Sequence, residues 1–306
     1  MHGRHRARGA RITGAALVAA ALASCSSPSP PRNAHPGPLK LAGTEYMAPL
    51  LRAEILAFRD RYPDADSIQL TANGSAEGME QLVNGEVSMS LLLRDLTDPE
   101  ADAAMKRDGL QAFPIAWDAV AVIVNPASPV EQISKTELGS IYAGDITAWG
   151  PLGWKAGGDL IALTSGPRLG IYGYIGQTLL NDRPYASTIY APPSEQEVVE
   201  VVATRRNAIA CVSRPVAEAA GAKVKLLRVS QALGLPYVAL DRETLLTKRY
   251  PLLRAISIAT PAQPAETAGN FVNFVSGIDG QQIVARHGYA PATVPIRIVR
   301  TAEEAQ

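Results

Sequence analysis

The alternation of short apolar runs with longer runs of helical periodicity constrains the fold of this chain most strongly. Strand-like runs occur as LKLA at 39–42, SIQLTA at 67–72 and VSMSLLL at 87–93. After the first of them, apolar residues recur at helical spacing from Met47 to Phe58. Strands that alternate with helices predict an α/β fold with mainly parallel sheets, in which ligands bind where the carboxyl ends of the strands meet.

The same alternation continues through the rest of the chain. Further predicted strands are AFPIAWDAVAVIVNP at 112–126, DLIALT at 159–164, AIACVS at 208–213 and LLRAISIAT at 252–260. Two capping boxes, Ser134 with Glu137 and Ser194 with Glu197, predict helix starts. Ser75 follows an Asn-Gly turn, so we expect its hydroxyl to cap the next helix.

The first 24 residues have the pattern of a signal peptide. A basic stretch precedes the small and apolar run ITGAALVAAALAS, which is too short to span a bilayer and ends in Leu22-Ala23-Ser24-Cys25. This ending resembles a bacterial lipobox, which implies lipidation of Cys25; the alternative is cleavage nearby with an incidental cysteine. Residues 25–38 are rich in Ser and Pro and predict an extended tether, so the expected location is the cell envelope, facing the periplasm or the exterior.

The composition excludes several classes of function. The formal net charge is +0, so no basic excess favours nucleic acid. His287 is the one histidine after the tether, which leaves too few for a histidine-rich metal site, and it is expected to lie at a helix C-terminus. Cys211 is expected to be a buried core residue. No nucleophile elbow or nucleotide-binding motif occurs, so we expect no enzyme activity, no cofactor and no metal.

The run TSGPRLGIYGYIGQTLL, at 164–180, changes from a turn into a helix near Gly170. A loop that leads into a helix N-terminus offers backbone N–H groups to an anion. Arg168 is the strong anion-binding side chain of this loop, whereas Leu169 and Ile171 stand where hydroxyl groups would serve an anion. The loop is therefore a candidate ligand site.

At this point the residues resemble a family, the PstS-like phosphate-binding proteins of bacterial phosphate ABC transporters. The carrying stretches are AWDAVAVIVNP, IYAGDITAWG, RYPLLRAISIAT and FVNFVSGIDGQQIVARHGYAP. The resemblance covers about residues 39–296 and implies the two-lobe periplasmic-binding-protein fold with two crossover hinge strands. We expect residues 39–117 with 250–297 in lobe 1, residues 118–249 in lobe 2, and a tail at 298–306.

The resemblance also assigns the ligand loops. The residues that it implies for ligand binding are Thr44, Glu45, Tyr46, Ser75, Arg94, Ser165, Arg168 and Gly170. The family's fourth loop reads Arg-x-x-Gly-Ser-Gly-Thr, and its arginine, serine and threonine are replaced here by Ser165, Leu169 and Ile171. With these donors missing we expect phosphate to bind weakly at best. Glu45 is expected to fill part of the anion site, so that Glu45→Thr raises oxyanion affinity and Arg168→Ala abolishes what remains.

These observations predict a lipid-anchored extracytoplasmic solute-binding protein, a monomer whose ligand is an oxyanion or a related small solute. Its expected partners are this ligand, the membrane through the lipid anchor, and an ABC permease or another membrane protein. The alternative hypothesis is a binding-protein fold with a lapsed site that acts as a structural or signalling partner and binds no phosphate.

Overall fold

The computed structural model describes residues 38–43, 45–72, 74–94, 96, 98–105, 109–181 and 183–293. The chain divides into two units, Met1–Ala34 and His35–Gln306, of which the first lies outside the described residues. The predicted signal peptide, Cys25, most of the tether and the tail at 298–306 also lie outside them, so these predictions are not tested by the structure.

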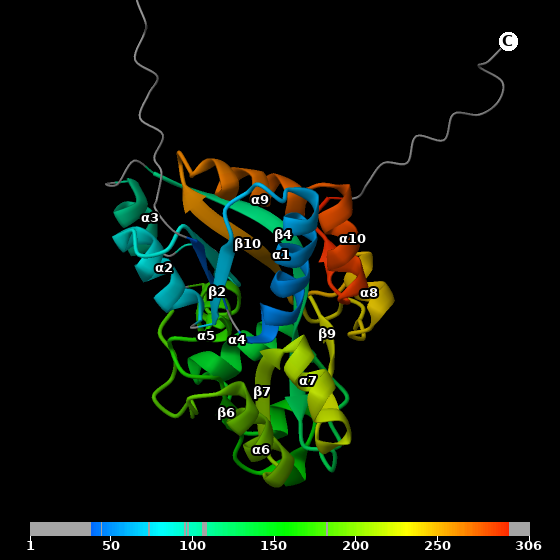
Figure 1. Cartoon of the computed structure of the whole chain (residues 1–306). Helices are drawn as coiled ribbons and strands as arrows, with labels where there is room; N and C mark the ends of the chain where they lie inside the picture. Colours follow the sequence, from blue (N-terminus) through cyan, green and yellow to red (C-terminus); the bar gives the residue numbers. More distant parts are fainter. Residues whose placement is uncertain are drawn as a thin grey trace, which may run out of the picture. The chain divides into compact units, whose positions relative to one another are not determined.

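The first lobe is a mixed sheet with helices on both faces (Figure 1). Its strands are β1 (Leu39–Gly43), β2 (Ile68–Ala72), β3 (Met89–Leu92), the first part of β4 (Leu110–Val124) and β10 (Leu253–Pro261). Strands β1, β2 and β3 are parallel, and β10 runs antiparallel to both β3 and β4. Its helices are α1 (Ala48–Arg61), α2 (Ser75–Asn84), α3 (Asp98–Met105), α9 (Glu266–Ser276) and α10 (Ile278–Arg286). Two apolar clusters fill the lobe, one under α1, α9 and α10 and the other under α2.

The second lobe repeats this arrangement around a smaller sheet. Strand β7 (Ala208–Ser213) lies between the second part of β4, to which it is antiparallel, and the parallel strand β6 (Ile161–Leu163). One face packs against α4 (Lys135–Ala143) and α5 (Gly170–Thr178), and the other against α6 (Glu195–Thr204) and α7 (Arg214–Ala220). The elements of the whole described chain not yet named are the strands β5 (Gln132–Ser134), β8 (Lys225–Leu226), β9 (Arg228–Ser230) and β11 (Ala290–Pro291), the helix α8 (Arg242–Leu246), and short 3-10 turns.

Strand β4 connects the two lobes. It pairs with β10 up to Ala119 and with β7 from Val120 onward, so a single strand changes its sheet at this point. The backbone N–H of Val120 donates to the carbonyl of Leu252, which holds the chain that leads into β10 beside the same point. The predicted α/β two-lobe class is therefore confirmed, while the exact lobe boundaries stay a prediction.

Local signals located most helix starts. The Ser134 hydroxyl accepts from the N–H of Glu137, and the Glu137 carboxylate accepts from the N–H of Ser134, so this capping box is confirmed. Ser194 also accepts from the N–H of Glu197. The predicted cap at Ser75 is wrong, because Gly74 holds the N-cap position with a φ of 89° and Ser75 is the first helical residue. Among the described residues, no helix is both long enough and apolar enough to cross a membrane.

Candidate functional site

The carboxyl end of β2 brings one predicted ligand residue into the interior between the lobes. Gly74 turns the chain in the left-handed region, which glycine adopts without the steric cost of a Cβ. Ser75 then starts α2 with its side chain fully buried, and its Oγ has no hydrogen-bond partner within the described part of the chain. A Cβ built on Gly74 would lie 3.6 Å from the carbonyl oxygen of Arg168. The turn at Gly74 and Ser75 and the loop around Arg168 therefore face each other.

The loop after β3 supplies apolar contact where an anion would need donors. Leu93 is buried, and its Cβ lies 3.1 Å from an ideal Cβ on Gly170, the first residue of α5. The Oγ of Ser75 lies 3.3 Å from the same point. The first turn of α5 is thus covered by one leucine and one serine from the other lobe, and the structure brings the predicted residues Ser75 and Gly170 together.

Arg94 does not join this pair. Its Nη1 and Nη2 each lie 2.7 Å from a carboxylate oxygen of Glu100, in a two-pronged ion pair. The aliphatic part of the Arg94 side chain passes beside Gly173 of α5, where an added Cβ would lie 2.5 Å from the Arg94 Cδ. The absence of a side chain at Gly173 therefore makes room for Arg94, which extends along the side of α5 rather than over its N-terminus.

The fourth loop divides into a buried part and an exposed part. Thr164 and Ser165 are fully buried, and neither hydroxyl has a hydrogen-bond partner among the described residues. Arg168 is 72% exposed and its Nη2 reaches Glu77 on α2 at 3.4 Å. Because an exposed ion pair of this kind contributes only about 0–1 kcal/mol, it brings the two lobes together without fixing them.

The structure describes part of the predicted ligand loop that follows β1. Thr44 lies outside the described residues, and Glu45 is described by its backbone, which opens a 3-10 turn at Glu45–Met47. The Tyr46 hydroxyl donates to Oε1 of Gln196 on α6 at 3.2 Å, a contact between the lobes. The predicted role of Glu45 in the anion site stays a prediction.

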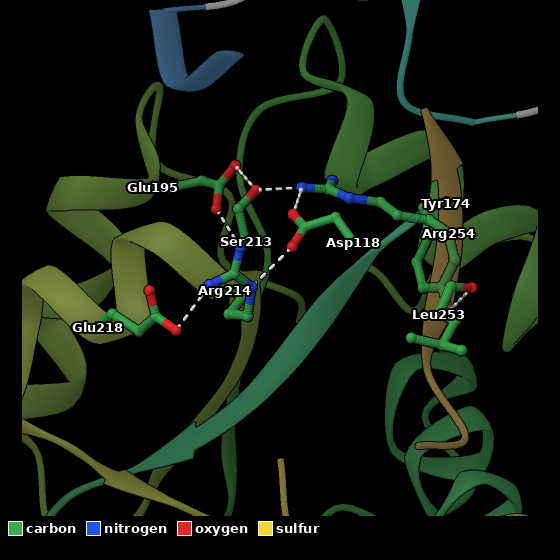
Figure 2. Close-up of polar contacts among 8 residues, drawn as sticks. All are labelled: Asp118, Tyr174, Glu195, Ser213, Arg214, Glu218, Leu253 and Arg254. Atoms are coloured by element: carbon green, nitrogen blue, oxygen red, sulfur yellow. Dashed lines mark hydrogen bonds and ion pairs between the residues drawn. The ribbon is translucent and has the colours of Figure 1, made fainter. Parts of the chain in front are cut away.

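Sequence reasoning missed a buried charged network at the junction of the lobes (Figure 2). Asp118 on β4 accepts from Arg214 Nε at 2.9 Å through Oδ1 and from Arg254 Nη2 at 3.2 Å through Oδ2. Arg254 Nη2 also donates to the Ser213 Oγ at 2.8 Å, and this hydroxyl in turn donates to Glu195 Oε1 at 2.9 Å. Burial raises the pKa of Glu195, while the nearby Arg254 lowers it. The sequence does show one charged residue inside each of two apolar runs, AWDAV and LLRAIS, and this pattern could have indicated the network.

The other residues that the sequence singled out, Cys211 and His287, have structural positions. The described residues hold no cluster of three or more His, Cys, Asp or Glu that suits a metal ion. Cys211 is a fully buried core residue, as predicted, and this burial raises the pKa of its thiol to about 12. The Nδ1 of His287 lies 2.9 Å from the carbonyl oxygen of Ile283 at the end of α10, as expected for a C-terminal position.

Two α/β lobes that share a crossing strand, and that meet at the carboxyl ends of their parallel strands, define the class of bilobal binding proteins. This chain belongs to the PBP superfamily, because the model of a PBP superfamily domain matches residues 26–277.

Relatives and solved structures agree with this assignment. The phosphate-binding protein PstS of Pseudomonas aeruginosa is 25% identical over 287 residues, covering 87% of this chain and 86% of that protein. The protein of the same name from Bacillus subtilis is 28% identical over 278 residues, covering 88% and 85% respectively. The crystal structure of an ABC-type phosphate transport receptor from Vibrio cholerae matches with a TM-score of 0.65 at 20% identity, covering 82% of this chain and 99% of the receptor.

Proposed function

We propose that this chain is a lipid-anchored extracytoplasmic solute-binding protein that captures a small oxyanion between its lobes for an ABC importer. The family assignment and the phosphate-binding names of its relatives support this function. The fold assignment rests on most of the chain, and the ligand class rests on unpaired polar groups in the loops at the ends of the strands.

The observation that carries the proposal is a set of buried hydroxyl groups without partners. Ser75, Thr164 and Ser165 each follow the carboxyl end of a strand, and none of the three hydroxyls pairs with another described residue. A buried polar group that makes no hydrogen bond costs about 1–3 kcal/mol. An anion placed beside these groups accepts their hydrogen bonds and removes that cost. These hydroxyls fit an acceptor-rich ligand better than an apolar one.

The contacts between the lobes connect ligand capture to closure. Tyr46 with Gln196, and Arg168 with Glu77, join side chains of opposite lobes, and each pair is exposed. Exposed contacts of this kind are weak, so the lobes separate at low cost to admit or release a ligand. An importer needs this property, because a tightly locked protein would not deliver its solute.

Binding is tested by calorimetry and thermal unfolding of the purified full-length chain with phosphate, sulfate and organic phosphates. A ligand at a hundred times its dissociation constant stabilises the folded protein by about 2.7 kcal/mol. Phosphate is expected to bind weakly, because three missing charge-assisted hydrogen bonds would reduce affinity by more than about a thousandfold. If none of these oxyanions changes the unfolding transition, the ligand class is wrong.

A second candidate function is a lapsed site on a protein that acts through a partner. Leu93 packs on the first turn of α5, where an anion would need access to the backbone N–H groups. In this case no oxyanion binds, and a membrane protein partner is retained by the intact fold. Permease and ATPase genes beside the gene for this chain would favour uptake over this alternative.

The lipid anchor is tested separately from the ligand. Labelled fatty acid is expected to enter the wild-type protein through Cys25, which follows Leu22-Ala23-Ser24. Cys25→Ala is expected to release the protein from the membrane fraction or to leave the signal peptide uncut. Wild-type protein without label would contradict lipidation and leave the binding function open.

A further inference from the structure

Arg254 is a buried cation with unused donors. Its side chain is 2% exposed, and one of its three nitrogens, Nη2, makes both of its hydrogen bonds, to Asp118 and Ser213. The other two, Nε and Nη1, have no partner among the described residues. Charged donors left unpaired in an interior are more costly than neutral ones. If Arg254 served only as a counter-ion for Asp118, its two unpaired nitrogens would have no role.

Contacts of neighbouring residues relate Arg254 to the candidate site. Strands β6 and β7 are parallel with Ala162 beside Ile209, and their pairing ends after Leu163, where the Tyr142 hydroxyl lies between the Leu163 carbonyl and the Cys211 N–H. Since side chains alternate along a strand, Ser213 shares the face that Cys211 presents to α5. Tyr174 of α5 donates to the carbonyl of Leu253 at 3.2 Å, which holds α5 against the residue before Arg254 (Figure 2).

The loop and the network also meet on the other side. An ideal Cβ on Gly166 would lie 3.6 Å from the Pro192 carbonyl oxygen, in the segment that leads to Glu195. Glu195 accepts hydrogen bonds from both the backbone N–H and the hydroxyl of Ser213. The loop that carries the unpaired hydroxyls of Thr164 and Ser165 therefore lies beside the segment that leads into the charged network.

The charge of this region limits what it can accept. Asp118 and Glu195 face Arg214 and Arg254, so the buried set is neutral when both carboxylates are ionised. Glu218 is an additional partner of Arg214, but its side chain is 58% exposed. A dianion would leave two uncompensated negative charges among buried groups, and a singly charged anion leaves one. Because burying uncompensated charge is costly, the smaller charge is favoured.

We propose that Arg254 is the anion-recognising arginine of this chain and that the site selects a singly charged oxyanion. Arg254 then serves from strand β10 in place of the loop arginine of the PstS-like family, whose position Ser165 occupies. The inference rests on the proposed function, because it names the residue and the charge class of the same ligand.

The test compares phosphate with sulfate by calorimetry on the full-length chain in mildly acidic buffer. Under this condition phosphate is mainly a monoanion, whereas sulfate is a dianion of similar size and shape. We expect phosphate to bind at least about tenfold more tightly than sulfate. Arg254→Gln is expected to reduce phosphate affinity about a hundredfold, and Arg254→Lys about tenfold, since lysine keeps the charge and loses the planar fork.

Matched variants separate recognition from folding. Arg183→Gln removes an exposed arginine of the second lobe that pairs with Asp145, and it is expected to leave affinity unchanged. Thr164→Val keeps the side-chain shape, removes one unpaired hydroxyl and is expected to reduce affinity about fivefold. If Arg254→Gln fails to fold, Arg254→Lys and Thr164→Val decide the question, and wild-type affinity in both overturns the inference.

The outcomes distinguish this inference from the proposed function. If the Arg254 variants bind the oxyanion normally and Arg168→Gln does not, the inference is overturned. The proposed function is then retained, with the exposed loop arginine as the anion-binding residue. Sulfate bound as tightly as phosphate overturns the charge selection. Wild-type protein that binds neither anion overturns the inference, and it contradicts the proposed function itself if organic phosphates do not bind either.

Discussion

Glu54 on α1 gives the sharpest prediction about stability. Its side chain is fully buried, and both carboxylate oxygens lack hydrogen-bond partners among the described residues. Burial raises its pKa from the ordinary value of 4.5 to about 8, and the charge of Arg286 opposes this only in part. In the folded protein Glu54 is therefore a neutral acid over a range of pH in which the unfolded chain carries it as a carboxylate.

The direction of the pH effect follows from proton binding. Between pH 4.5 and about 8 the folded state holds a proton on Glu54 that the unfolded state has lost, so raising the pH favours unfolding. The free energy of unfolding falls by about 1.4 kcal/mol per pH unit over this interval, or by up to about 5 kcal/mol in all. This stabilisation is fully present below the unfolded pKa and is lost as the pH rises through the folded pKa.

The perturbation is Glu54→Gln, which keeps the shape of the protonated acid and cannot ionise. We measure urea denaturation by circular dichroism at several pH values across this interval. At each pH the free energy of unfolding of the variant is subtracted from that of the wild type. The variant is expected to be similar to the wild type at the acidic end and several kcal/mol more stable at the basic end. Glu80→Gln, on the exposed side of α2, is the matched control. A difference between wild type and Glu54→Gln that does not change with pH would refute the reasoning.

Three further predictions concern single contacts. Tyr142→Phe removes a buried hydroxyl that donates to the Leu163 carbonyl at 2.8 Å and accepts from the Cys211 N–H at 3.0 Å, so urea denaturation is expected to show a loss of about 2–3 kcal/mol. Gly74→Ala places a Cβ on a residue with a φ of 89°, and a loss of about 1–2 kcal/mol in thermal unfolding is expected; an unchanged transition would contradict this backbone strain. Ser134→Ala removes the N-cap of α4 and is expected to cost about 1 kcal/mol, whereas wild-type stability would show that the capping box is not needed.

Much of the fold could be predicted because its signals are local. Apolar periodicity and turn residues identified the strands on both sides of α1, and the capping box at Ser134 was located within one helical turn. The cap assigned to Ser75 was wrong because the helix starts one residue earlier than a serine cap requires, at a glycine in the left-handed region. A sequence shows that Gly74 can adopt this conformation but not that it does.

The site was harder to predict, because its contacts join distant parts of the chain. Asp118 and Arg254 lie 136 residues apart, and their pairing depends on the antiparallel register of β4 and β10. Each of them appeared in the sequence as a single charge in an apolar strand, without any sign of a partner. Arg168 attracted attention because it lies in a recognisable loop, yet it is largely exposed in the structure. The ligand-binding roles of all the predicted residues, and the lipidation of Cys25, stay predictions.

The change of sheet along β4 has a mechanical consequence. When two rigid bodies rotate about an axis, each atom moves in proportion to its distance from that axis, and Asp118 lies two residues before Val120, where the strand joins its second sheet. If the lobes turn about the crossing strands, Asp118 and its two arginines therefore hardly move, whereas Tyr46 and Gln196, which belong to opposite lobes, move apart. On such a rotation the charged network is expected to stay assembled while the lobes open, and spectroscopic labels at positions 46 and 196 would report each opening.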